Sequence, residues 1–156
     1  MPTAESVTIQ DYLAIMRAFN QYCRAIDDRQ WDDLDHVFSK DALWIMATGL
    51  EVNGVEEIKS LMRQFSPDLP YRYLHTVSNI DLQFEGDTVT STSNWTYLVR
   101  KSPENGPTEE MHVFDNAWYV GSVGTYDDRL EKIDGEWLFT YRRIFNWEFS
   151  EPPTGD

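Results

Sequence analysis

The chain is poor in cysteine, in positive charge and in long apolar runs. Its single cysteine, Cys23, cannot form an internal disulfide. Thirteen basic residues against 27 acidic ones give a formal charge of −14, which disfavours nucleic acid and anionic membrane surfaces as partners. No stretch approaches the ~18 apolar residues of a membrane span, and the N-terminus has no signal-peptide pattern. We therefore expect a soluble, cytoplasmic protein with neither nucleic acid nor membrane as a partner.

Several chemistries lack their sequence patterns. Histidine, cysteine and carboxylate residues do not cluster at metal-ligand spacing, and there is no glycine-rich phosphate loop. The stretch Gly121-Ser-Val-Gly124 lacks the G-x-S-x-G spacing of a nucleophile elbow. The sequence therefore predicts neither a metal nor a cofactor.

The N-terminal half has the period of amphipathic helices. Thr8 and Asp11 form a capping box that begins a helix expected to end near residue 28. Further elements are expected as a helix over 31–38, a strand over 42–46 and a helix over 55–65. Two apolar stripes should face the core: Tyr12, Met16, Phe19, Cys23 and Ile26 on the first helix, and Val55, Ile58, Met62 and Phe65 on the third.

The C-terminal half has the period of strands. Extended segments are expected over 71–84, 88–101, 110–132 and 136–148, with tight turns at 85–87 and 134–135. Three helices followed by an antiparallel meander predict an α+β fold, and a curved sheet around helices leaves a pocket for a small apolar ligand. We expect one domain over 8–148, with flexible tails at 1–7 and 149–156.

Asp27 continues an apolar stripe at the end of the first helix. A buried carboxylate is costly unless it is paired, and the helix dipole disfavours negative charge at this end. Either Asp27 faces water in the turn, or it has a specific partner. His75 shares a strand face with Tyr71, Tyr73 and Val77, where it is either a hydrogen-bonded core residue or the partner of Asp27. A carboxylate that accepts the Nδ1 proton would leave Nε2 free as a base.

The last strand places a positive charge among aromatic rings. Its odd positions are Trp137, Phe139, Tyr141, Arg143, Phe145 and Trp147. Strand alternation therefore puts Arg143 on an aromatic face, where it pairs with a carboxylate, stacks on rings or binds a ligand. Its neighbour Arg142 faces the other way and is expected in solvent. Cys23 lies on the buried stripe and is expected to be inert, and His36 and His112 are expected on polar surfaces.

Together these residues resemble the SnoaL-like branch of the NTF2-like superfamily. The segments that carry the resemblance are Tyr22-Cys-Arg-Ala-Ile-Asp27, Trp31-Asp-Asp-Leu34, His75, Tyr126-Asp-Asp-Arg-Leu130 and Asp134-Gly-Glu-Trp137. The resemblance covers residues 8 to 148 and implies a cone-shaped fold: three N-terminal helices packed in a strongly curved antiparallel sheet, around a deep pocket.

Three enzymes of that superfamily use an Asp–His dyad: scytalone dehydratase, hexachlorocyclohexane dehydrochlorinase and bile-acid 7α-dehydratase. Asp27 and His75 match the dyad, Tyr22 resembles a tyrosine of the bile-acid enzyme, and Arg143 resembles an arginine on its last strand. The chain departs from scytalone dehydratase in two regions. Tyr97 and Val99 stand where a second histidine would be, and Gly124 and Tyr126 stand where a Ser and Asn pair would be. Scytalone is therefore not expected as the substrate.

The resemblance implies a cofactor-free lyase of the dehydratase type, or an isomerase, acting on a small hydrophobic polycyclic, steroid-like or terpenoid substrate. The expected catalytic residues are His75, Asp27 and Tyr22. The expected substrate-binding residues are Arg143, Tyr97, Tyr126, Trp44 and Trp95. Two alternatives stay open: a non-catalytic partner subunit of a ring-hydroxylating dioxygenase, and a ligand-binding module without turnover. A homodimer or homotrimer is expected.

Overall fold

The computed structural model describes residues 7–65, 72–100 and 118–147. His112, the start of the strand expected over 110–132, and the two expected tails apart from Val7 lie outside these residues. The helices are α1 (Ile9–Asp27), the 3-10 helix η1 (Trp31–His36) and α2 (Val55–Phe65). The strands are β1 (Phe38–Ile45), β2 (Glu51–Asn53), β3 (Arg72–Glu85), β4 (Thr88–Arg100), β5 (Trp118–Ile133) and β6 (Glu136–Asn146). In the part of the chain described, no helix is long and apolar enough to cross a membrane.

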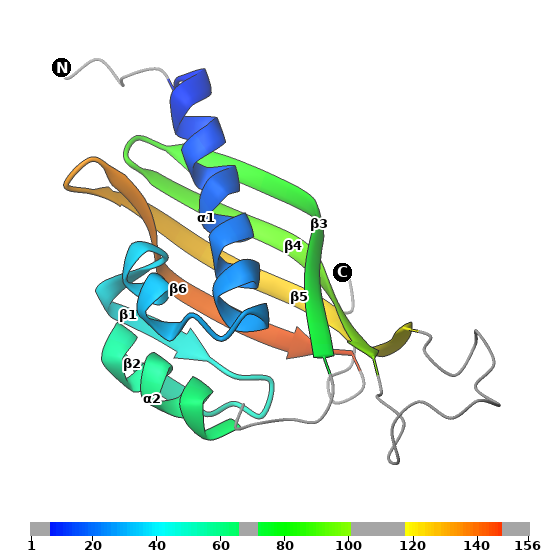
Figure 1. The fold of residues 1–156 in the computed structure, drawn as a ribbon. Coiled ribbons are helices and arrows are strands. Elements are labelled where there is room, and N and C mark those ends of the chain that lie inside the picture. Colours follow the sequence, from blue (N-terminus) through cyan, green and yellow to red (C-terminus); the bar gives the residue numbers. More distant parts are fainter. Residues whose placement is uncertain (1–6, 66–71, 101–117, 148–156) are drawn as a thin grey trace, which may run out of the picture.

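The strands form one six-stranded sheet in the order β2-β1-β6-β5-β4-β3. Helix α1 lies across one face of this sheet, and α2 lies beside β1 and β2 at the other end (Figure 1). The α+β class is confirmed, but two details of the prediction change. The sheet is not wholly antiparallel, because β1 runs parallel to β6. Among the described residues, the helical part consists of two α-helices and one 3-10 helix, and β1 and β2 lie between η1 and α2 in sequence.

The capping box that begins α1 is confirmed. The Asp11 backbone N–H donates to Thr8 Oγ1 at 3.1 Å, and the Thr8 backbone N–H donates to Asp11 Oδ2 at 3.1 Å. Asp11 also accepts hydrogen bonds from Lys132 and Trp137, at 2.9 Å each, on the strands β5 and β6. The start of α1 is therefore tied to the far end of the sheet.

The buried face of α1 is rotated relative to the predicted face, because most of its residues precede the predicted ones by one position. The buried residues are Ile15, Ala18, Phe19, Tyr22, Ala25 and Ile26. Tyr12, predicted to be buried, is 48% exposed, while Met16 and Cys23 are half-buried. Both stripes satisfy the helical period and share Phe19 and Ile26, so periodicity alone did not separate them.

Two differences concern the short elements. Phe38 was expected at the end of a helix, but it is the first residue of β1. On α2, Phe65 is exposed rather than buried, and Lys59 is buried instead. The Lys59 Nζ lies 2.8 Å from Asp35 and 2.6 Å from Glu56, so two carboxylates compensate the buried ammonium. This pairing ties α2 to η1.

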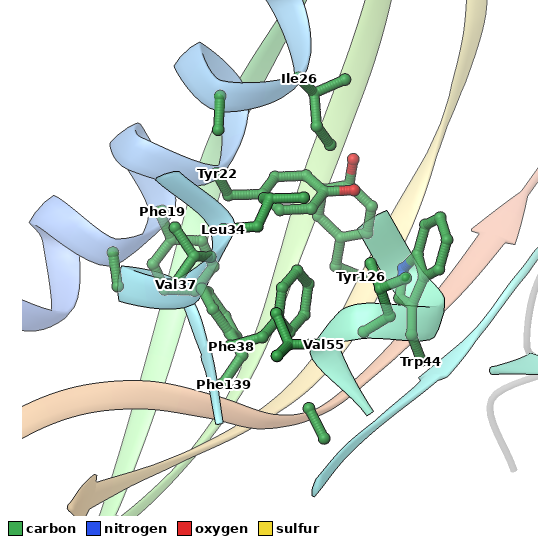
Figure 2. Packing of buried hydrophobic residues seen from close by; sticks show 14 of the residues in the cluster. Phe19, Tyr22, Ile26, Leu34, Val37, Phe38, Trp44, Val55, Tyr126 and Phe139 are labelled. Carbon is green, nitrogen blue, oxygen red and sulfur yellow. The ribbon is translucent and has the colours of Figure 1, made fainter. Parts of the chain in front are cut away.

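The core fills the space between the helices and the inner face of the sheet, and aromatic rings pack among its aliphatic side chains (Figure 2). The rings of Phe19 and Phe139 meet edge to face, with centroids 5.0 Å apart. Tyr22 makes the same kind of contact with Phe38 and with Tyr126, at 5.9 Å each. Such pairs add stabilisation beyond the area that they bury.

The faces predicted for Arg142 and Arg143 are wrong. Leu130 and Arg129 are consecutive on β5 but pair with Phe139 and Tyr141, so Thr140 has no opposite residue and forms a β-bulge. A bulge of one residue exchanges the two faces of the strand beyond it. Arg142 is consequently fully buried. Arg143 is exposed, with its guanidinium over the Phe145 ring at 4.6 Å.

Hydrogen bonds to one carboxylate compensate the charge of the buried Arg142 along one edge of its guanidinium. Its Nε and Nη2 donate to the two carboxylate oxygens of Asp128 at 2.7 and 2.8 Å. The guanidinium carbon also lies 4.1 Å from the ring centroids of Tyr22 and Tyr126. Neither side chain of the ion pair has any exposed surface. Removal of one partner would leave an uncompensated charge in the core.

We therefore expect Arg142→Met to lower the free energy of unfolding by about 3–5 kcal/mol, because Asp128 would stay buried without its partner. The neighbouring Arg143→Met is the control and should change it by less than about 1 kcal/mol. Urea denaturation followed by tryptophan fluorescence measures both. A larger loss for Arg143→Met than for Arg142→Met would contradict the assignment of the two faces.

Candidate active site

Asp27 and His75 lie together, as their positions in the sequence suggested. The Asp27 Oδ1 lies 2.6 Å from the His75 Nδ1. The two carboxylate oxygens also accept the backbone N–H of His75, at 3.0 and 2.9 Å. The Asp27 side chain is 8% exposed, and the His75 side chain is 17% exposed. One carboxylate thus holds both the ring and the backbone of one histidine.

The fold explains why the two residues meet. Asp27 is the last residue of α1, and His75 lies on β3, at the edge of the sheet. An edge strand has backbone N–H groups without a neighbouring strand, and Asp27 accepts one of them. Because a carboxylate only accepts hydrogen bonds, the Nδ1 atom of neutral His75 carries the proton. The Nε2 atom is then the unprotonated, basic nitrogen.

Aromatic rings surround the imidazole on its own face of the sheet. Tyr97 lies directly opposite His75 on β4, with ring centroids 5.1 Å apart. Tyr73 meets the imidazole edge-on at 6.0 Å. The Tyr73 hydroxyl donates to the Ile26 carbonyl at 3.2 Å, which connects β3 to the last turn of α1. The predicted site residue Tyr97 is therefore adjacent to the candidate base.

Tyr22 and Tyr126 lie deeper, with both rings against the Arg142 guanidinium. Both are fully buried, and burial raises the pKa of each phenol despite the opposing effect of Arg142. Both phenols therefore stay protonated at neutral pH and can donate hydrogen bonds.

The two predicted tryptophans differ in how their indole N–H groups are used. The Trp95 Nε1 donates to the carbonyls of Thr125 and Phe145, at 3.2 Å each, so it holds β4 to the next strands. Trp44 is 2% exposed, and its Nε1 has no hydrogen-bond partner among the described residues. Only the Trp44 indole is therefore available to a ligand.

Trp44 belongs to a row of polar groups on the inner face of the sheet. The register places Trp44 beside Arg142, Arg142 beside Asp128, and Asp128 beside Ser91. Within the described ranges, three buried atoms of this row have no hydrogen-bond partner: Trp44 Nε1, Arg142 Nη1 and Ser91 Oγ. The hydroxyl of Ser93, which is also buried on β4, has none either. Buried polar groups usually have partners, so this row is suited to a bound polar group.

Sequence reasoning missed Arg142, Asp128 and the two serines. The serines alternate with Val89 and Trp95 on one face of β4, a period-2 signal that could have placed them inside. No such signal existed for Arg142, because its face depends on the bulge at Thr140. Burial raises the pKa of the Cys23 thiol to about 11, in keeping with the expectation that Cys23 is inert.

Two hollows of the described surface lie away from Asp27 and His75, and the first of them reaches Ser91 and Asp128 of the row. One of about 700 Å³ lies on the outer face of the sheet and is lined by Asp81, Thr92 and Tyr141, among others. Another of about 640 Å³ lies between α1 and the β5–β6 turn. Neither is lined by Asp27 or His75. The deep pocket expected around these two residues stays a prediction.

Similar solved structures share this fold. A protein of unknown function with a cystatin-like fold from Nostoc punctiforme superimposes with a TM-score of 0.70, at 20% identity and over 96% of each chain. The hexachlorocyclohexane dehydrochlorinase LinA-type3 of Novosphingobium barchaimii has a TM-score of 0.71, at 19% identity over 94% of this chain and 93% of that one. At these identities the likeness establishes the fold.

Sequence comparison gives the family. The uncharacterized protein Rv2910c of Mycobacterium tuberculosis is 36% identical over 84 residues, which are 53% of this chain and 56% of that protein. The chain thus spans about half the length of the mycobacterial relatives that it matches. The model of the SnoaL-like domain matches residues 7–143. The chain therefore belongs to the SnoaL-like domain family.

Proposed function

We propose that the chain is a cofactor-independent lyase or isomerase in which His75 is the general base. One observation carries the proposal: the Asp27 Oδ1 lies 2.6 Å from Nδ1 of a partly buried histidine. In the neutral tautomer that this contact favours, Nε2 is the basic nitrogen. This arrangement orients the ring and stabilises the imidazolium that forms when the ring takes a proton. The substrate proposed is a small, largely apolar polycyclic, steroid-like or terpenoid molecule, in keeping with the aromatic surroundings of the ring.

The proposed step begins when Nε2 of His75 removes a proton from a carbon of the substrate. In an elimination, the electron pair of that C–H bond forms a C=C bond, and a leaving group departs with its bonding electrons. In an isomerisation, the imidazolium returns the proton to another carbon. Both routes are balanced by proton transfer alone, so they require no oxidant, reductant or cofactor.

Negative charge that develops on the substrate needs hydrogen-bond donors. The interior offers Arg142 Nη1 and Trp44 Nε1, both buried and without a partner among the described residues. The neutral hydroxyls of Tyr22 and Tyr126 lie beside the same guanidinium. We assign these groups to the leaving group or the developing oxyanion. Arg142 thereby takes the role that the sequence had suggested for Arg143, which is exposed.

The dehydrochlorinase with a similar fold supports elimination as the reaction class, because its name describes the loss of hydrogen chloride. The same fold is also compatible with ligand binding without turnover, and with a non-catalytic partner subunit of a ring-hydroxylating dioxygenase. The Asp27–His75 contact favours catalysis, because a purely structural edge contact would need the backbone N–H alone. The experiments below decide among these functions.

The first experiment identifies the ligand and then measures turnover. The protein is incubated with a lipophilic metabolite extract, and mass spectrometry identifies what binds and what changes. With that substrate, His75→Gln should lower kcat by about 10²–10⁴-fold while the affinity is largely kept, since a base acts mainly in the transition state. The exposed His36→Gln is the matched control and should keep the wild-type rate. A wild-type rate for His75→Gln would refute the mechanism.

Asp27→Asn should also lower kcat steeply, because an amide at this position favours the wrong imidazole tautomer. The double variant Asp27→Asn/His75→Gln should be no slower than the worse single variant, since the two residues act as one unit. The neighbouring Asp28→Asn is the charge-matched control and should remain active. Steady-state kinetics of the four variants give the comparison. Fully additive losses would show that Asp27 acts independently of His75.

We further propose that the chain is a homodimer or homotrimer that associates through the outer face of the sheet. Leu74, Leu98 and Val120 form one row across β3, β4 and β5 on that face, and Leu74 and Val120 are 41% and 64% exposed. An apolar row on an open sheet is typical of an interface. Light scattering should give a multiple of the chain mass of 18.3 kDa, and Val120→Glu should shift it toward one copy. A wild-type mass of one chain at micromolar concentration would contradict this.

A further inference from the structure

The end of helix α1 contains an arginine where glycine is favoured. The Gln30 N–H donates to the Ala25 carbonyl at 2.8 Å, and the Arg29 N–H donates to the Ile26 carbonyl at 3.2 Å. These two bonds form a Schellman motif, in which the residue at the position of Arg29 adopts the left-handed conformation. Arg29 has a φ of 57°, which is uncommon for a residue with a long side chain. Strained positions of this kind are often functional.

The Arg29 side chain has an unusual environment for this acidic chain. Acidic residues outnumber basic ones by 27 to 13, and Lys59, Lys132 and Arg142 all pair with carboxylates. Among the described residues, none forms a hydrogen bond or ion pair with the Arg29 guanidinium. Its contact is with the face of the Tyr73 ring, at 5.7 Å from the centroid. The guanidinium donors are thus available to a ligand.

Arg29 lies close to the candidate base. The Tyr73 ring that it covers meets the His75 imidazole edge-on at 6.0 Å. Arg29 also follows Asp27 by two residues at the same helix end. One aromatic ring therefore separates the imidazole from a half-buried guanidinium that has no hydrogen-bond or ion-pair partner among the described residues. A substrate of a few rings that reaches His75 can reach Arg29 at the same time.

We propose that Arg29 recognises an anionic group of the substrate, so that the site takes small apolar acids, with a carboxylate as the recognised group. This inference rests on the proposed function, since it concerns the same site. Guanidinium groups bind carboxylates through two parallel hydrogen bonds, and the aromatic ring behind Arg29 holds it in place. The carboxylate would fix which end of the substrate faces His75. Arg29 would thus determine specificity, and His75 would carry out the proton transfer.

A pair of matched probes tests the proposal without knowledge of the substrate. Sodium 2-naphthoate and 2-naphthamide have the same rings and differ in charge. Titration of ¹⁵N-labelled protein, followed by backbone and His75 ring resonances, gives the affinity and the place of binding for each. Wild type should bind the naphthoate at least about tenfold more tightly than the amide, with shifts at His75 and Tyr73.

Arg29→Gly is the informative variant, because glycine is the favoured residue at this position of the helix end and the fold is kept. It should lose the preference for naphthoate and bind the two probes about equally. Arg24→Gln removes the same charge from an exposed position of the last helical turn and should keep the preference. Arg29→Lys should keep only part of it, since the ammonium cannot bind in two parallel bonds.

The proposal would be overturned if wild type bound neither probe, if it bound both equally, or if Arg29→Gly kept the preference. His75→Gln separates this inference from the proposed function. It should keep the preference for naphthoate even though it ends turnover. If the protein preferred naphthoate through Arg29 but turned over no substrate, the recognition of acids by Arg29 would be supported. Only the proposed catalysis by His75 would then be refuted.

Discussion

The carboxylate of Asp27 ties the end of a helix to the edge of a sheet, and the candidate site depends on this contact. It accepts hydrogen bonds from the backbone and from the ring of the same residue, His75. The backbone bond fixes where β3 lies against α1, and the ring bond fixes how the imidazole is turned. The penalty of a nearly buried negative charge at a helix C-terminus is offset by these bonds. Position and chemistry are therefore set by one interaction.

A second constraint operates deeper in the core. Arg142 is accommodated in the interior because Asp128 binds one edge of its guanidinium and the rings of Tyr22 and Tyr126 pack against it. The remaining Nη1 has no partner among the described residues, and neither has the indole N–H of Trp44 beside it. A charge held in this way is preorganised, since little reorganisation is needed when a negative group binds. Such a row is costly to the fold, and substrate binding is the reason we assign for it.

Features that depend on residues close together in the sequence could be predicted. Features that depend on how the strands pair in the sheet could not. The capping box of α1 follows from residue type and spacing, and Asp27 and His75 could be paired because each breaks an apolar pattern. The arginines of β6 could not be assigned, since the bulge at Thr140 comes from pairing with β5 and reverses the alternation beyond it. The row of unpartnered groups was equally hidden, because it joins residues of strands far apart in the sequence.

The protonation state of the His75 ring tests the central claim most directly. Long-range ¹H–¹⁵N correlation spectra of the free protein report which ring nitrogen carries the proton in the neutral imidazole. If Asp27 orients the base, the proton lies on Nδ1 and Nε2 is bare, and Asp27→Asn changes this pattern without unfolding the protein. A neutral His75 with its proton on Nε2 would contradict the account, because the nitrogen assigned to proton abstraction would already be occupied.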